Sequence, residues 1–78
     1  MESMNTACVD GNATVADASR LMRELNVDQV VVTEVGQGVA VPVGILSARD
    51  VVDRVVALDL DASVVTAADV VSLARPQS

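Results

Sequence analysis

The stretch GILSARD (residues 44–50) marks the point at which the sequence changes from a strand pattern to a helix pattern. Its aliphatic residues are typical of the end of a buried strand. Ser47, followed by Asp50 three positions later, has the spacing of a helix capping box. The same spacing recurs at TVAD (residues 14–17) and TAAD (residues 66–69). The sequence therefore predicts three helix starts.

The length and composition indicate one small domain with a thin core. The chain has 78 residues, 51% of them hydrophobic and none aromatic. A chain of this size buries only about 60% of its unfolded surface when it folds. Apolar residues beyond what one small domain can cover are typical of an association surface. We therefore expect a homo-oligomer, with a homodimer as the simplest form.

The net charge argues against two classes of partner. Eleven acidic residues and five basic ones give a net charge of −6. Binding to the phosphates of nucleic acid requires a basic face, and binding to a membrane surface requires a basic amphipathic helix. No apolar run approaches the roughly 18 residues of a membrane-spanning helix. We expect no nucleic-acid partner and no membrane partner.

The side chains needed for most catalytic chemistry are scarce. The chain has one cysteine, Cys8, and no histidine, so it lacks the grouped ligands of a zinc site and the base that would activate a thiol. We expect Cys8 to be a small buried residue, no metal site and no enzymatic activity. A single cysteine and the lack of a signal-peptide pattern predict a cytoplasmic protein.

The first half of the chain predicts a helix and a hairpin. Apolar residues from Val15 to Leu25 follow the three-and-four spacing of one helical face, with Thr14 as the N-cap and Asn26 as the end. DQVVVTEV (residues 28–35) has three consecutive valines, which favour a strand buried on both faces. VGQG (residues 35–38) predicts a tight reversal into a second strand. Pro42 places part of that strand at an edge or a bulge.

The second half predicts two more helices. Valines after Ser47 cover a wide arc of one helix, part of which we expect to meet another subunit. DLDAS (residues 59–63) ends this helix, and TAADVVSLA (residues 66–74) begins a short one before the tail RPQS. Together with an extended piece around Cys8, this order predicts an α+β fold of two layers. A small three-stranded sheet is packed by two main helices and a short C-terminal helix.

The surroundings of Ser47 differ from those of the other two capping pairs. Gly44 allows close approach at the end of the strand, Arg49 supplies a fixed cation, and a helix start suits a phosphate. Asp50 suits the hydroxyl pair of a ribose. Two hypotheses follow: the pair binds a ribose phosphate, or it only caps the helix.

The sequence resembles the cystathionine β-synthase (CBS) domain family. GILSARDVVDRVV is similar to the family signature, in which a glycine and an aliphatic pair precede Ser or Thr and, three residues later, Asp. NATVADASRLMRELNVDQVVV resembles the opening of the repeat, and ALDLDASVVTAADVVS resembles the bacterial form in which one repeat runs into the next. The resemblance implies a single CBS domain over residues 1–78, with the core repeat at 6–60 and a lead-in segment at 61–78.

The resemblance also implies a function. CBS repeats pair into a Bateman module whose clefts bind AMP, ATP, S-adenosylmethionine or NAD as regulatory ligands, with no obligatory cofactor. Carried over to this chain, Asp50 holds the ribose hydroxyls, Ser47 contacts the ribose or phosphate, and Arg49 meets a phosphate. The adenine pocket is then lined by the segment around Asn12, Ala13 and Thr14 and by the strand residues Val30, Val31 and Val32. The net charge favours AMP, adenosine or S-adenosylmethionine over ATP.

Three departures from the family pattern support an alternative. Val31 stands where the family often carries proline, Ala48 stands where related repeats often carry an acid, and the chain holds one complete repeat. The alternative is a dimerisation module with a vestigial cleft and no ligand. In either case two copies must pair to form a cleft. The C-terminal helix then either folds back on its own domain or is exchanged with a partner.

Overall fold

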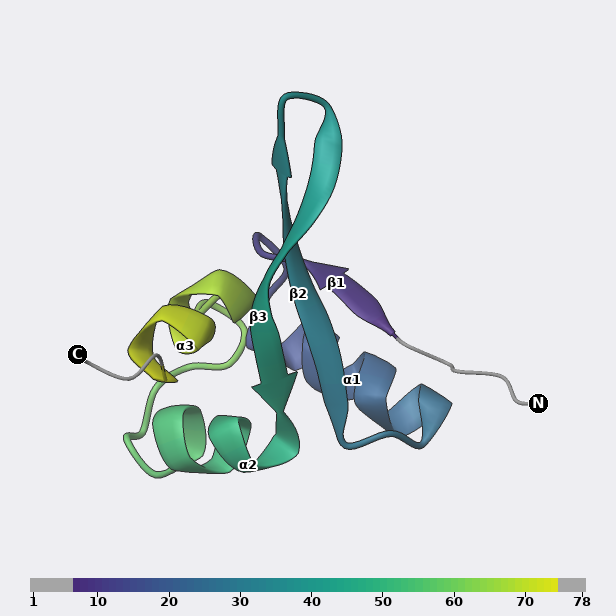
Figure 1. Ribbon diagram of the computed structural model, residues 1–78. Coiled ribbons are helices and arrows are strands. Elements are labelled where there is room, and N and C mark those ends of the chain that lie inside the picture. The colour runs from purple at the N-terminus through teal and green to yellow at the C-terminus, as the bar shows by residue number, and fades with distance from the viewer. Residues whose placement is uncertain (1–6, 75–78) are drawn as a thin grey trace.

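The computed structural model describes residues 7–74 as a three-stranded sheet with helices packed beside it (Figure 1). The elements, in chain order, are β1 (Cys8–Asp10), α1 (Val15–Leu25), β2 (Gln29–Gly36), β3 (Val39–Ser47), α2 (Ala48–Val51), the π-helix η1 (Val52–Val56) and α3 (Ala67–Ala74). The predicted α+β fold is confirmed. The start of the predicted core repeat at residue 6 and the tail RPQS lie outside the described residues.

The sheet has the order β1-β2-β3, with β2 in the centre. β1 runs parallel to β2, whereas β2 and β3 are antiparallel. The pairing of β2 with β3 shifts by one residue, because Val32 pairs with Gly44 and Thr33 with Pro42, so Val43 has no partner in β2. The prediction for Pro42 is confirmed in both of its forms, since β3 is an edge strand and contains a bulge.

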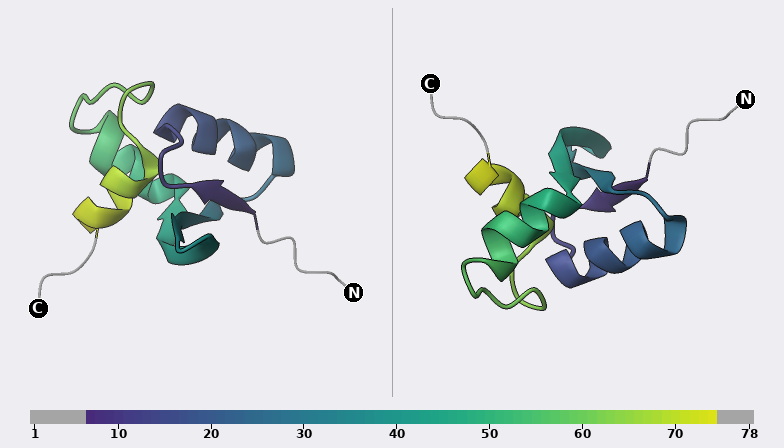
Figure 2. Two further views of the ribbon diagram at one scale, coloured as in Figure 1. Left: turned by 90° about the horizontal axis from the view of Figure 1, so that it is seen from above. Right: turned by 90° about the horizontal axis from the view of Figure 1, so that it is seen from below.

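The two faces of the sheet differ in burial. Val30 and Val32 point into the core, where they are 1% and 0% exposed, while Val31 between them is half-buried on the other face. On that face Val31 pairs with Cys8 of β1 and Ile45 of β3; Cys8 is exposed and Ile45 is 55% exposed. The expectations that Cys8 is buried and that β2 is buried on both faces are therefore wrong. The described helices pack against the core face and beside the β3 edge, and leave this second face, here called the open face, uncovered (Figure 2).

The core is small and aliphatic, as the composition predicts. It joins side chains from the sheet, from α1 and from the two C-terminal helical segments. Its buried members are Val15, Ala18, Met22, Val30, Val32, Leu46, Val55, Ala67 and Val70. Because α3 contributes two of these residues, the C-terminal helix folds back on its own domain.

All three predicted helix starts are confirmed. The hydroxyl oxygens of Thr14, Ser47 and Thr66 each accept a hydrogen bond from the backbone N–H three residues later, at 3.1, 3.0 and 3.2 Å. Each bond satisfies one of the N–H groups that a helix start leaves without a partner. Asn26 ends α1 in the left-handed conformation, with a φ angle of 57°.

The β2–β3 hairpin extends beyond the rest of the sheet (Figure 1). Gln37 and Gly38 form its reversal with φ angles of 55° and 79°, as a two-residue type I′ turn requires. Beyond Thr33, β2 has no neighbour in β1, since the pairing of the two strands ends where Asp10 meets Thr33.

The helical segment after β3 has a buried side and an exposed side. Val55 is fully buried, whereas Val52 and Val56 are 53% and 65% exposed. The wide apolar arc predicted for this segment therefore exceeds what its own domain covers. No helix within residues 7–74 has the length and apolar character needed to cross a bilayer.

Candidate functional site

The candidate site lies at the corner where β3 turns into α2. The hydroxyl oxygen of Ser47 accepts a hydrogen bond from the N–H of Asp50 at 3.0 Å. In return, Oδ2 of Asp50 accepts one from the N–H of Ser47 at 3.1 Å. This capping box fixes the carboxylate of Asp50 beside the end of the strand. A carboxylate accepts about four hydrogen bonds, so Asp50 retains acceptor capacity for a pair of hydroxyls.

The start of α2 offers an anion fewer donors than the sequence predicts. The N–H of Ala48 donates to the backbone oxygen of Asp28 at 2.9 Å, and the N–H of Asp50 is bonded to Ser47. Two of the first three N–H groups of the helix therefore have partners within the chain. A phosphate here would depend on the N–H of Arg49 and on the Arg49 side chain.

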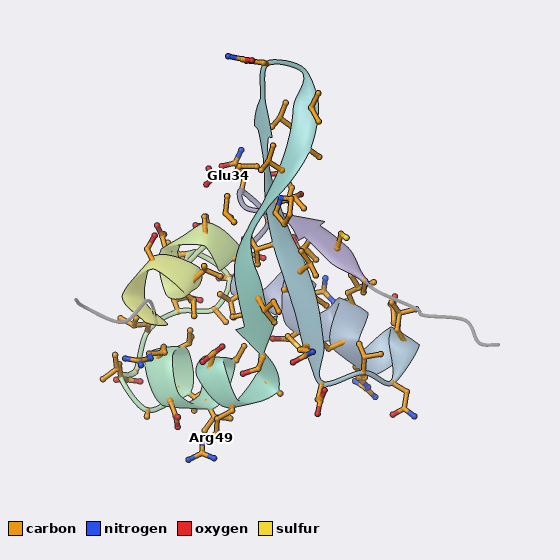
Figure 3. All side chains as sticks on the ribbon, viewed as in Figure 1. Glu34 and Arg49 are labelled. Carbon is orange, nitrogen blue, oxygen red and sulfur yellow. The ribbon has the colours of Figure 1, made fainter. Side chains whose placement is uncertain are left out.

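Arg49 extends from the helix into solvent (Figure 3). Its Nε lies 3.1 Å from Oδ2 of Asp53, and its side chain is 83% exposed. An exposed ion pair between residues four apart on a helix contributes only about 0.3–0.5 kcal/mol to stability. The guanidinium can therefore leave Asp53 for a phosphate at little cost in free energy.

The apolar part of the candidate site lies on the open face. Ile45 pairs with Val31 directly across the sheet, and Ile45 precedes Ser47 by two residues, so both share a face with Ser47. Val30 and Val32, which the resemblance assigns to an adenine pocket, point into the core instead, at 1% and 0% exposure. The alternation of strand side chains explains the difference, because neighbours in a strand face opposite ways. Ile45 was not predicted as a site residue, although its alternation with Leu46 indicates that the two side chains lie on opposite faces of the strand.

The remaining predicted residues, Asn12, Ala13 and Thr14, lie at the other end of the sheet. They follow Asp10, which pairs with Thr33, whereas Ser47 pairs with Gln29. Thr33 and Gln29 are four residues apart along β2, a distance of roughly 13 Å. The structure therefore does not bring this lead segment (residues 10–14) together with Ser47 and Asp50 in one chain.

The lead segment has its own surroundings. A hollow of about 260 Å³ lies between it and the root of the hairpin, lined by Asp10, Asn12, Glu34 and Val35. Figure 3 shows Glu34 at this root, far from Arg49. Asn12 is exposed, but the backbone oxygen of Ala13 accepts a bond from the N–H of Ala67 at 2.8 Å. Of the three predicted residues, only Asn12 therefore lines this hollow.

Capping geometry alone does not distinguish the candidate site. Thr66 and Asp69 form the same reciprocal pair as Ser47 and Asp50, with distances of 3.2 and 3.4 Å. At the third start, Asp17 instead pairs with Arg20 at 2.9 Å. The corner at Ser47 differs in its position, since it borders the open face. Among residues 7–74, no three His, Cys, Asp or Glu side chains are grouped to hold a metal ion.

A comparison with protein families supports the resemblance seen in the sequence. The family model described as CBS domain matches residues 2–57. A search of curated proteins finds no match to the sequence.

Solved structures share the fold. Hypoxic Response Protein I, solved with two coordinated zinc ions, is 25% identical with a TM-score of 0.77; the match covers 88% of this chain and 55% of that one. The hexameric CBS-CP12 protein from bloom-forming cyanobacteria is 29% identical with a TM-score of 0.73, covering 87% and 38%. The CBS domain protein PAE2072 from Pyrobaculum aerophilum, complexed with AMP, is 23% identical with a TM-score of 0.75, covering 88% and 50%. The chain thus spans about half or less of each of these proteins.

Proposed function

Because the chain belongs to the CBS domain family, we propose that it is a regulatory module that binds an adenosyl nucleotide in a cleft between two paired copies. One observation carries this proposal: the carboxylate of Asp50 is held at the border of an uncovered apolar face that includes Val31 and Ile45. A carboxylate beside an apolar surface suits a nucleoside, since the ribose needs acceptors and the base needs an apolar contact. The proposed role involves no chemical step.

The separation of the two groups of predicted residues supports the pairing. The lead segment, which the resemblance assigns to the adenine pocket, lies roughly 13 Å along the sheet from the Ser47 pairing in the same chain, so it cannot supply contacts to the base of a nucleoside held by Asp50. A second copy placed against the open face can supply them. Pairing would also cover Ile45, which is 55% exposed in the single chain. We therefore propose a homodimer as the ligand-binding form.

Charge guides the choice among adenosyl ligands. The net charge of −6 per chain is doubled in a dimer, and it opposes highly charged anions. We propose AMP, adenosine or S-adenosylmethionine as better ligands than ATP. The AMP complex of PAE2072 supports AMP as the first candidate, since that protein shares the fold. We place this role in the cytoplasm, where a free thiol such as Cys8 stays reduced.

The second candidate function is a dimerisation module without a ligand. Two observations favour it: the Thr66 and Asp69 pair reproduces the capping geometry of Ser47 and Asp50, and the N–H of Ala48 already has a partner. In this case Asp50 contributes only to helix stability.

Thermal unfolding with millimolar AMP, ATP, S-adenosylmethionine or NAD separates the two candidates. A ligand at a hundred times its dissociation constant adds about 2.7 kcal/mol to stability, which moves the midpoint of so small a domain by roughly 10–20 °C. Asp50→Ala should abolish the shift. Asp69→Ala is the matched control, because it breaks the same capping bond at α3, and it should keep the shift. No shift in the parent with any ligand would favour the dimerisation module.

A further inference from the structure

The β2–β3 hairpin carries an apolar surface that its own domain does not cover. Beyond Thr33, β2 has no neighbour in β1, so the hairpin arm (residues 34–41) is a ribbon of two strands. Val35, Val39 and Val41 on this arm are 68%, 62% and 48% exposed. An isolated ribbon of two strands is only marginally stable in water. Exposed valines gathered on such a ribbon are typical of an interaction surface.

One side of the hairpin arm continues the open face. Side chains alternate along β2, and the extra residue of the bulge belongs to β3, so Val35 shares a face with Thr33 and Val31. Ala40 pairs with Val35 and lies on the same side. Val39 lies on the opposite side, because it precedes Ala40 by one residue. Both views in Figure 2 show the teal arm on the side of the sheet away from α1, which is the side of the open face.

The hairpin arm can meet another copy of the chain without bringing like charges together. The sequence has no charged residue from Val35 to Ala48, a range that includes most of the arm and all of β3. The net charge of −6 therefore lies elsewhere on the chain, where it repels a second copy. The pairing proposed above already places a second copy against the open face. A second copy is thus the occupant that this uncharged extension of the open face fits.

The charges at the two ends of the open face favour one orientation of the pair. Asp10 and Glu34 line the hollow at one end. Residues 7–19 and 28–48, which include both of these acids, hold no basic residue to offset them. Head-to-head packing would bring the carboxylates of the two hollows together, which is unfavourable. Head-to-tail packing instead places each hollow at the candidate site of the partner, where the side chain of Arg49 is 83% exposed (Figure 3).

The strand lengths then determine what the hairpin arm meets. Head-to-tail packing brings the lead segment of one copy to the candidate site of the other, as the proposed function requires. The two-fold axis then passes Val31, which is midway between Gln29 and Thr33 on β2. Val35 lies four residues beyond Val31, roughly 13 Å from the axis. At this distance on the other side of the axis, β3 of the partner has ended at Ser47 and α2 has begun.

We propose that the hairpin arm of each copy docks on the corner of a second copy where β3 turns into α2. Val35 and Ala40 then lie against the first turn of α2 in the partner, and the two arms hold the pair at both ends. The inference rests on the pairing of two copies in the proposed function. It adds the orientation of the pair and the surface that fixes it.

Two valines on the hairpin arm provide a matched test of the docking surface. Val35 and Val39 are 68% and 62% exposed and lie on opposite sides of the ribbon. Val35→Asp places a charge inside the contact and should raise the dissociation constant of the dimer at least about tenfold. Val39→Asp adds the same charge outside the contact, where about 0.15 M salt screens it, and should raise the constant less than about threefold. Sedimentation equilibrium measures both constants.

A spin label locates the hairpin arm on the partner. In a Cys8→Ser background, Val39→Cys carries a nitroxide on the side of the arm that faces away from the contact. This chain is mixed with ¹⁵N-labelled Cys8→Ser chain, so the broadening of ¹⁵N-bound amide resonances arises only between two copies. Arg20→Cys in the same background carries the label on the exposed side of α1 and measures random collisions. The mixtures are recorded with and without millimolar AMP.

The label on the arm should broaden the amide resonances of Ala48, Arg49 and Asp50 more than the Arg20→Cys control does. Broadening confined to residues 36–38 would show that two arms meet head to head, and it would overturn the inference. A monomer with no broadening beyond the control, with or without AMP, would also overturn it, as would equal effects of Val35→Asp and Val39→Asp.

The thermal shift with AMP separates this inference from the proposed function. A shift without broadening at α2 would retain nucleotide binding and reject the docking of the arm. Broadening at α2 without a shift would retain the docking of the arm and reject the ligand.

Discussion

Ser47 and Asp50 each accept a hydrogen bond from the backbone N–H of the other, at 3.0 and 3.1 Å. This reciprocal pair ends β3 and begins α2, and it fixes a carboxylate beside the open face. The same two residues thus serve the stability of the fold and the proposed binding of a ribose. Substitutions at this corner are best compared with equal changes at Thr66 and Asp69, which make the same bonds away from the open face.

Replacement of the cap should destabilise the domain measurably. Ser47→Ala leaves the N–H of Asp50 without its partner and should cost about 1 kcal/mol. Ser47→Asp keeps an acceptor at the N-cap and should cost much less. Urea unfolding of the two variants checks this prediction, and equal stability of Ser47→Ala and the parent would contradict it.

Neighbouring residues on β3 should respond very differently to truncation. Leu46 is fully buried, so Leu46→Ala should cost about 2–5 kcal/mol. Ile45 is 55% exposed, so Ile45→Ala should cost about 0.5 kcal/mol or less in the unpaired chain. Chemical unfolding at low chain concentration compares them. Similar losses would show that the two faces of the sheet are wrongly assigned.

The carboxylate of Asp61 should titrate below its usual range. The hydroxyl and the backbone N–H of Ser63 both donate to Asp61, at 2.6 and 2.9 Å, and they lower its pKa, the hydroxyl more strongly. The resulting stability is present above the unfolded pKa, near 3.9, and is lost as pH falls through the lower folded pKa.

Ser63→Ala removes the hydroxyl but keeps the backbone donor. The pKa of Asp61 should therefore rise part of the way toward its ordinary value. Carbon-detected NMR titration of the Asp61 carboxyl group measures the change. An identical pKa in parent and variant would show that the hydroxyl bond is absent in solution.

The hairpin reversal should be sensitive to residue type. Gly38 has a φ angle of 79°, which disfavours any side chain, so Gly38→Ala should cost about 1 kcal/mol. Gln37 has a φ angle of 55°, which asparagine tolerates better, so Gln37→Asn should stabilise by a few tenths of a kcal/mol. Thermal unfolding midpoints of the two variants check this prediction. The midpoint of Gly38→Ala should fall and that of Gln37→Asn should rise; changes of the same sign would contradict this turn.

Local features were predictable from the sequence because they depend on near neighbours. The three helix starts needed only a hydroxyl and an acid three residues apart, and the reversal at Gln37 and Gly38 needed only the glycines around it. Pro42 constrained its strand for a chemical reason, the lack of an N–H. These features do not depend on how the elements pack.

Packing decided the features that the sequence did not predict. Consecutive valines in β2 fit a strand covered on one face or on both, so the exposure of Cys8 and the opposite directions of Val30 and Val31 required the structure. A glycine at position 44 is compatible with the close approach of either a ligand or a helix. Only the position of Val71 shows that the neighbour is α3. The separation of Asn12 from Asp50 likewise follows from strand order, which is a property of the whole sheet.

Titration of the ¹⁵N-labelled chain with AMP tests most directly whether Asp50 holds a ribose at the border of the open face. Saturable shifts should appear in the amide resonances of Ile45, Arg49 and Asp50, and should be absent in Asp50→Ala but retained in Asp69→Ala. Shifts confined to Asp10 and Asn12 at the hollow, or no shifts at millimolar AMP, would contradict the proposed site.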